Sequence, residues 1–97
     1  MSLTTLSPAA ENDLLEIWLY VAQDKVGAAD RLIQRLRLKC DLLGQNPLAG
    51  RARSDLTLGL RSFSVDNYVV YYRVTRLGVE VARILSGYQD PTRIFED

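Results

Sequence analysis

The spacing of the hydrophobic positions changes partway along the chain and divides the sequence into a helical part and a strand part. From residue 8 to residue 43 the apolar residues recur every three or four positions, which is the spacing of one helix face. From residue 59 to residue 85 they come in short runs rich in valine and tyrosine, which favour strands. The pattern therefore predicts helices followed by strands.

The first helix is predicted to begin at Pro8, after the short alternating stretch SLTTLS (2–7), which is typical of a brief edge strand. Ser7 can cap this helix, and proline suits its first position because the missing N–H is not needed there. The apolar stripe predicts an amphipathic helix of about four turns. Its members, with Trp18 expected in the core, are Ala10, Leu14, Ile17, Trp18 and Val21.

A second helix follows after a few polar residues, so the two are predicted to form an antiparallel hairpin. Cys40 lies on the apolar stripe and is interpreted as a small buried hydrophobe rather than a reactive thiol. Gly44 is predicted to take the left-handed conformation that ends a helix, and Pro47 forbids continuation. The stripe consists of Ala29, Leu32, Ile33, Leu36, Cys40 and Leu43.

Three strands are predicted in the second half: GLRSFSV (59–65), YVVYYRV (68–74) and VEVARIL (79–85). The links between them, Asp66-Asn67 and 76–78, are short enough for hairpin turns, so an antiparallel meander is expected. Strict alternation would place Val79, Val81, Arg83 and Leu85 on one face of the last strand, opposite Glu80, Ala82 and Ile84.

The fold class that follows is α+β, with a helical hairpin packed on one face of a small antiparallel β-sheet, in a single domain over residues 1–97. In the middle strand, the face with Tyr68, Val70, Tyr72 and Val74 lies opposite the face with Val69, Tyr71 and Arg73. Neither face is polar throughout. A second sheet face that is still apolar predicts that a partner covers it.

Composition excludes several classes of function. The chain has 12 basic and 12 acidic residues, so direct binding of DNA through a general basic surface is not expected. One cysteine and no histidine exclude a disulfide framework and the usual zinc sites, and no cofactor is expected. No apolar run reaches the roughly 20 residues that span a bilayer, so no membrane association and a cytoplasmic location are expected.

The arginines are unevenly distributed. Six of them lie between Arg51 and Arg83, against three acidic residues in the same interval. Arginine suits bidentate contacts with carboxylates or phosphates. Two interpretations remain open: these arginines meet a partner, or they are solvated strand-edge charges with one or two structural ion pairs.

Four blocks of the sequence resemble the ParE branch of the RelE/ParE toxins of bacterial type II toxin–antitoxin modules. They are LSPAAENDLLEIWLYVA, NPLAGRAR, GLRSFSV with NYVVYYRV, and VEVARILSGYQD, in the family's order from about Leu3 to Asp90. The resemblance implies a β-α-α-β-β-β fold. It also implies a cognate ParD-like antitoxin whose C-terminal segment folds on the toxin, as a hetero-oligomer, with a homodimer of the toxin as another assembly.

The resemblance implies inhibition of DNA gyrase for a ParE-type toxin and ribosome-dependent mRNA cleavage for a RelE-type one. Aligned with the nucleases, Ser64 stands where they carry a catalytic arginine, and Gln89 and Phe95 stand near their other catalytic positions. A reduced nuclease set of Arg61, Arg83 and Tyr88 is the alternative, but partial sets of groups that act as a unit are poor catalysts. No catalytic residue is therefore expected.

A third interpretation is a weakly toxic or repurposed antitoxin-binding module. It rests on the turn after the last strand, where relatives commonly carry a histidine or a basic pair and this chain has Ser86, Tyr88 and Gln89. The candidate antitoxin-binding residues are Leu60, Arg61, Phe63, Tyr71, Arg73 and Arg83. The candidate target-binding residues, in the last turn and the tail DPTRIFED, are Tyr88, Arg93, Ile94 and Phe95, and the tail's alternative role is to pack on the sheet.

Overall fold

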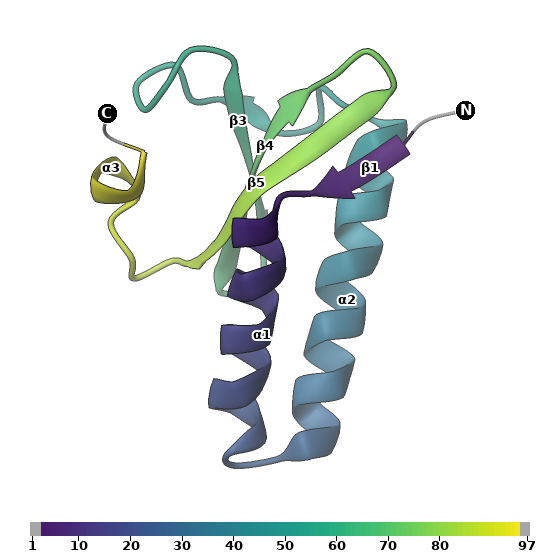
Figure 1. Cartoon of the computed structure of the whole chain (residues 1–97), viewed down its shortest axis with the longest axis vertical. Helices are drawn as coiled ribbons and strands as arrows, with labels where there is room; N and C mark the ends of the chain where they lie inside the picture. Colours follow the sequence, from purple (N-terminus) through teal and green to yellow (C-terminus); the bar gives the residue numbers. More distant parts are fainter. Residues whose placement is uncertain (1–2, 96–97) are drawn as a thin grey trace.

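The computed structural model describes residues 3–95, so Ser2 of the predicted edge strand and the last two residues of the tail lie outside it. Two long helices stand side by side against a sheet, and a short third helix lies apart from them (Figure 1). This confirms the predicted α+β fold with a helical hairpin. The elements in chain order are β1 (Leu3–Leu6), α1 (Pro8–Ala22), α2 (Val26–Gln45), β2 (Arg51–Ala52), β3 (Leu60–Val65), β4 (Tyr68–Val74), β5 (Gly78–Ser86) and α3 (Pro91–Ile94).

The sheet has five strands in the order β1-β5-β4-β3-β2. The meander of β3, β4 and β5 is antiparallel as predicted, and β2 pairs antiparallel with β3. The first strand, however, pairs parallel with the last one, which brings Leu6 opposite Val81. The sheet is therefore mixed rather than purely antiparallel. Alternation of apolar residues does not specify the neighbour of a four-residue strand, so this pairing had no signal in the sequence.

A β-bulge overturns the strict alternation predicted for the last strand. The pairing of β4 with β5 shifts register at Ala82, which is left without a partner. As a result Ile84 joins Val81 in the core under the helices, whereas Arg83 and Leu85 turn to the opposite face. The alternation predicted for β4 holds, because that strand carries no extra residue.

The start of α1 forms as its sequence predicts, but the end of α2 does not. The Ser7 hydroxyl accepts a hydrogen bond from the Ala10 N–H at 3.0 Å. Gly44 is not left-handed; it lies in the last turn of α2, where an added Cβ would collide with Oγ1 of Thr4. The residue is needed for the close approach of α2 to β1, and Asn46 terminates the helix instead.

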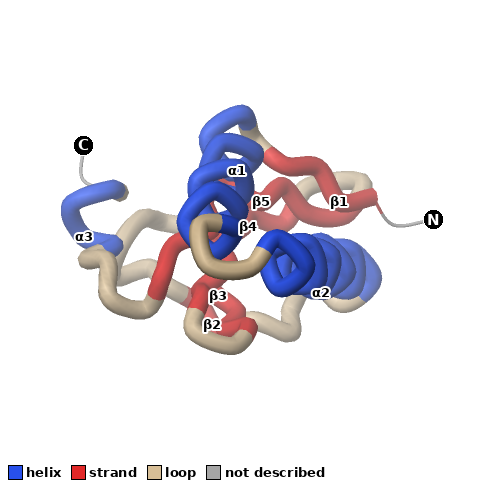
Figure 2. The backbone as a smooth tube through the Cα atoms, turned by 90° about the horizontal axis from the view of Figure 1, so that it is seen from below, coloured by secondary structure: helices blue, strands red, loops and turns tan. Residues whose placement is uncertain are grey.

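The main core lies between the helical hairpin and the sheet (Figure 2). Tyr72, Leu36 and Cys40 are completely buried in it, which confirms the interpretation of Cys40 as a core residue. Trp18 was expected there and is only half-buried. It lies toward the far end of the hairpin, where its indole N–H donates to Asp30 of α2 at 2.8 Å.

The burial of Cys40 has a consequence for its chemistry. Removal of the thiol from water raises its pKa from 9.0 to about 11. At pH 8 only about 0.1% of the native protein should carry a thiolate, so a thiol reagent should modify Cys40 at the rate of unfolding. Because the unfolded state ionises first, the protein should also lose stability as the pH rises from 9 to about 11. A labelling time course with and without denaturant checks this, and fast native labelling would contradict it.

The second face of the sheet is covered in part by the chain itself. Leu60, Tyr71 and Leu85 are buried there in a small second cluster. The tail closes over it, with the Phe95 ring 5.1 Å from that of Tyr71 and Ile94 beside it. The sequence suggested a partner for this face or packing by the tail, and the structure shows the packing.

Candidate functional site

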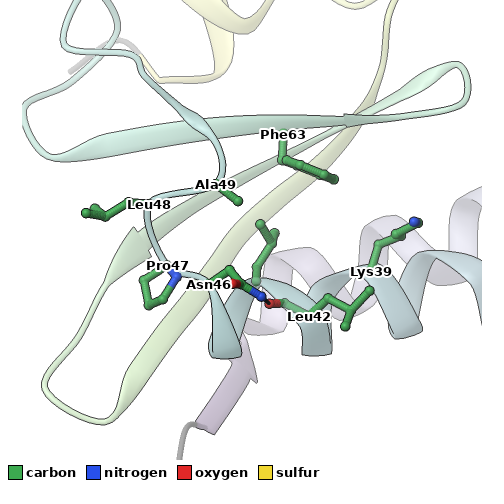
Figure 3. A pocket seen from close by; sticks show the side chains of 8 residues that line it. Lys39, Leu42, Asn46, Pro47, Leu48, Ala49 and Phe63 are labelled. Atoms are coloured by element: carbon green, nitrogen blue, oxygen red, sulfur yellow. Dashed lines mark hydrogen bonds between the residues drawn. The ribbon is translucent and has the colours of Figure 1, made fainter.

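An open apolar groove runs between the C-terminal half of α2 and strand β3 (Figure 3). Its volume is about 570 Å³. The helix forms one wall, Phe63 of β3 forms the other, and the loop between α2 and β2 closes one end. The residues that line it are Lys39, Leu42, Leu43, Asn46, Pro47, Leu48, Ala49 and Phe63.

The loop that closes the groove is held by two residues of the sheet. The Tyr72 hydroxyl donates to the Pro47 carbonyl at 2.7 Å and accepts from the Gly50 N–H at 2.8 Å. Arg61 donates through Nη2 to the carbonyls of Leu48 and Gly50. A single buried tyrosine and one arginine thereby bind four backbone groups between Pro47 and Gly50, so this wall of the groove is held in place before any partner arrives.

The lining is apolar, accessible and positively charged at one end. Leu42 is 40% exposed and Leu48 is 72% exposed. Lys39 is the charged residue of the lining, and within residues 3–95 it takes part in no ion pair. Beyond the two residues that pair with β2, the outer edge of β3 faces the groove region without a strand partner in the described chain. These features suit an amphipathic segment that carries carboxylates.

Of the six residues predicted to contact an antitoxin, Phe63 alone lines this groove. Leu60 and Tyr71 are buried on the opposite face beneath the tail, and Arg61 is used to hold the loop. Arg73 is partly exposed beside Leu60, on the strand that pairs with β3.

Arg83, the sixth candidate, forms an ion pair inside the protein. Its Nε and Nη2 each donate to the carboxylate of Asp13 at 2.8 Å, which raises the pKa of Arg83 above its ordinary value. The same carboxylate accepts the backbone N–H of Ile84 at 2.8 Å. β1 ends opposite Val81, so it does not pair with the later residues of β5. There the Asp13 carboxylate accepts the backbone N–H that a strand partner would otherwise bind. Of the two interpretations of the arginines, the geometry therefore supports a structural ion pair for Arg83.

The predicted target-binding residues divide into two groups. Tyr88 is 95% exposed and Arg93 is exposed, so both are accessible. Ile94 and Phe95 face inward, onto the second cluster. The carboxylate of Asp90 accepts from the Thr92 hydroxyl at 2.6 Å and caps the short α3 by accepting from the Thr92 N–H at 3.0 Å. These two hydrogen bonds, the one from the hydroxyl first, lower the pKa of Asp90.

Comparison with known proteins agrees with this geometry. The family model described as the ParE toxin of the type II toxin–antitoxin system, parDE, matches residues 5–91. This chain belongs to the ParE toxin family. Toxin ParE1 of Mycobacterium tuberculosis is 35% identical over 91 residues, which are 91% of this chain and 92% of that protein. Toxin ParE3 of Caulobacter vibrioides is 40% identical over 62 residues, which are 64% of this chain and 62% of that protein.

A solved structure with the same fold comes from a chromosomal ParDE toxin–antitoxin system of P. aeruginosa. It superposes with a TM-score of 0.75 at 21% identity and covers 89% of this ParE-family chain and 96% of that chain. The likeness supports the mixed sheet with two packed helices as the family's architecture.

The geometry of this ParE-family protein bears on the alternative nuclease set. The guanidinium of Arg83 is hydrogen-bonded to Asp13, and that of Arg61 is hydrogen-bonded to carbonyls of the loop. Both arginines of the alternative set therefore already have partners inside the protein. Within residues 3–95 no three residues among His, Cys, Asp and Glu come together as metal ligands.

No helix in the described part of the chain is long and apolar enough to cross a membrane.

Most of the groove was missed from the sequence, although a signal existed. Leu38 and Leu42 lie four residues apart on the second helix but outside its core stripe, and Leu48 follows in the next loop. Of these three, Leu42 and Leu48 line the groove and Leu38 does not. Leucines that leave the buried face of an amphipathic helix at helical spacing indicate a second apolar face. Pro47 and Ala49 carried no such signal, because only the folded loop brings them beside the helix.

Proposed function

We propose that this ParE-family protein inhibits DNA gyrase and is neutralised by a ParD-like antitoxin that binds in the groove beside α2. The observation that supports this most is the groove itself, since it is apolar, preformed and open along one side. An antitoxin segment that folds on binding needs such a surface to offset the entropy of its ordering.

The occupant expected in the groove is an amphipathic segment with carboxylates near one end. Its apolar side chains would contact Leu42, Leu48 and Phe63, and a carboxylate would meet the ammonium of Lys39, which has no ion pair within residues 3–95. Arg73 remains a candidate contact for a second part of the antitoxin. The other four predicted residues would contribute indirectly, by stabilising the structure that carries the binding surface: Leu60, Tyr71, Arg61 and Arg83.

Removal of the apolar walls should weaken antitoxin binding. Leu42→Ala combined with Phe63→Ala is expected to raise the Kd for a cognate ParD-like antitoxin by about 100-fold, because two buried contacts are lost at about 1–2 kcal/mol each. Isothermal titration measures the effect. Leu58→Ala is the matched control, since Leu58 is 88% exposed and lies outside the groove lining. An unchanged Kd for the double variant would place the antitoxin elsewhere.

The target contact is proposed to involve Tyr88 and Arg93, the accessible members of the predicted set. A purified supercoiling assay with gyrase, run beside in vitro translation, tests the function. We expect supercoiling to be inhibited and mRNA to stay intact, and the double variant Tyr88→Ala with Arg93→Ala to need at least about tenfold more protein for the same inhibition.

The alternatives give different results in the same pair of assays. Cut mRNA with unimpaired supercoiling would establish the nuclease interpretation. Full antitoxin binding without an effect in either assay would establish a repurposed binding module. A melting curve of the double variant controls for folding, and little change is expected because both side chains are exposed.

A further inference from the structure

A second groove lies beside α1 and has no residue in common with the first. Its volume is about 440 Å³. One wall is α1, and the others are the turn between β3 and β4 and the segment that follows β5. The lining residues are Glu16, Ile17, Tyr20, Asn67, Tyr68, Ser86, Tyr88 and Gln89.

Three tyrosines from three parts of the chain converge on this groove. Tyr20 is 75% exposed and Tyr88 is 95% exposed, whereas Tyr68 is partly buried. Exposure of two large aromatic side chains at one depression is costly in water and typical of contact surfaces. Burial raises the pKa of the Tyr68 hydroxyl, with Tyr20 as a second cause, which agrees with the closeness of these two side chains.

The charge of the groove is negative, and it comes from one residue. Helix α1 carries three acidic residues and no basic one. Glu11 is paired with Arg37, and Asp13 is paired with Arg83. Glu16 takes part in no ion pair within residues 3–95 and lines the groove, which contains no lysine or arginine.

We propose that this second groove binds an arginine side chain presented by a protein partner. The faces of Tyr20 and Tyr88 would contact the planar guanidinium, and the Glu16 carboxylate would accept its hydrogen bonds. Ile17 offers an apolar contact for the aliphatic stem. The first groove has the opposite character, with one lysine and no acid, so the two surfaces select segments of opposite charge.

The inference does not depend on gyrase being the target, since it concerns only the chemistry of the partner's side chain. The proposed partner also differs from the antitoxin proposed for the groove beside α2, because Glu16 would repel an acidic segment. Because the two linings share no residue, the proposal allows a partner to bind here while the groove beside α2 is filled.

The test uses the purified full chain and three capped peptides, Gly-Arg-Gly, Gly-citrulline-Gly and Gly-norleucine-Gly. Citrulline has the shape of arginine without its charge, and norleucine supplies only the apolar stem. In ¹H-¹⁵N spectra the arginine peptide should shift the amides of Glu16, Tyr68 and Ser86 with a Kd of about 1–10 mM, as expected for one exposed cation–aromatic site. The two neutral peptides should bind at least about fivefold more weakly.

Variants locate the interaction. Glu16→Gln should weaken the arginine peptide about fivefold and Tyr88→Ala about threefold, with no change in melting temperature because both side chains are exposed. Glu80→Gln, at an exposed carboxylate on β5 outside the groove, should leave binding unchanged. Equal binding of the arginine and citrulline peptides, undiminished binding by Glu16→Gln, or the absence of any saturable shift would each overturn the proposal.

Discussion

Replacement of Asp13 by alanine is expected to lower the free energy of unfolding by about 3 kcal/mol, which is a large part of the stability of a domain of this size. The substitution leaves the guanidinium of Arg83 without its bidentate partner. It also leaves the N–H of Ile84 without an acceptor at the edge of β5. The hydrogen bond to the Ile84 N–H is buried and the Asp13 side chain is only 10% exposed, so water can replace this contact only through a local opening of α1. The Arg83 side chain is 29% exposed and can be partly hydrated.

Urea unfolding followed by circular dichroism measures this effect. Glu11→Gln is the matched control on the same helix, since Glu11 and Arg37 form an ion pair in which both side chains are about half exposed. That change should cost about 0–1 kcal/mol. A cost below 1 kcal/mol for Asp13→Ala, equal to that of the control, would show that the pair contributes no more than a surface contact.

Replacement of Gly50 by alanine is the second change with a large expected effect. An added Cβ would lie 2.5 Å from the carbonyl oxygen of Ser62 and 2.7 Å from the hydroxyl of Tyr72. The loop would have to move away from β3, and the hydrogen bond from the Gly50 N–H to Tyr72 would be lost or distorted. We expect a loss of about 3 kcal/mol from overpacking and the unsatisfied group together.

The same substitution should also weaken antitoxin binding by about tenfold at concentrations where the protein remains folded, because the displaced loop is one wall of the groove. Gly27→Ala is the control, and it is expected to raise the stability of the protein rather than lower it. Gly27 lies exposed in the first turn of α2, where the side-chain end of Arg31 at 3.4 Å is the contact that an added Cβ would meet. Alanine there should stabilise by about 0.5–1 kcal/mol. A neutral Gly50→Ala would show that the loop can adapt.

The two grooves lie on two faces of the protein, and a different partner is proposed for each. They flank the helical hairpin, one beside α1 and one beside α2, and their linings carry opposite charge. The tail, by contrast, is a structural cover as well as a candidate contact, since Ile94 and Phe95 hold it on the second cluster. Its removal would expose Tyr71 and Leu85, so point substitutions at exposed positions separate target binding from stability better than truncation.

The local features of the fold were predictable because they depend on short-range chemistry. The Ser7 cap, the two amphipathic helices and the antiparallel meander follow from spacing, capping and turn residues that act within a few positions. The burial of Cys40 followed from its place on the apolar stripe of the second helix.

The predictions that were wrong, and the features that were not predicted, all depend on contacts between distant segments. The bulge at Ala82 changes the face of every residue after it, and alternation alone cannot show an extra residue. Gly44 was interpreted as a helix terminator, whereas its role is to admit β1, which lies 40 residues earlier in the chain. Trp18 followed the stripe in register but is not part of the main core, and its indole contacts Asp30 of α2 instead.

The sequence by itself determined the elements, their order, the α+β class and the resemblance to ParE toxins, since these rest on local propensity and on residues read in order. Only the tertiary structure decided what the charged and aromatic residues do. It assigned Arg83 to Asp13, Arg61 and Tyr72 to the loop, and Phe95 to the sheet, and it formed two grooves from segments far apart in the chain. The reason is physical: a side chain's partner is set by packing in three dimensions, which the spacing of residues along one segment does not contain.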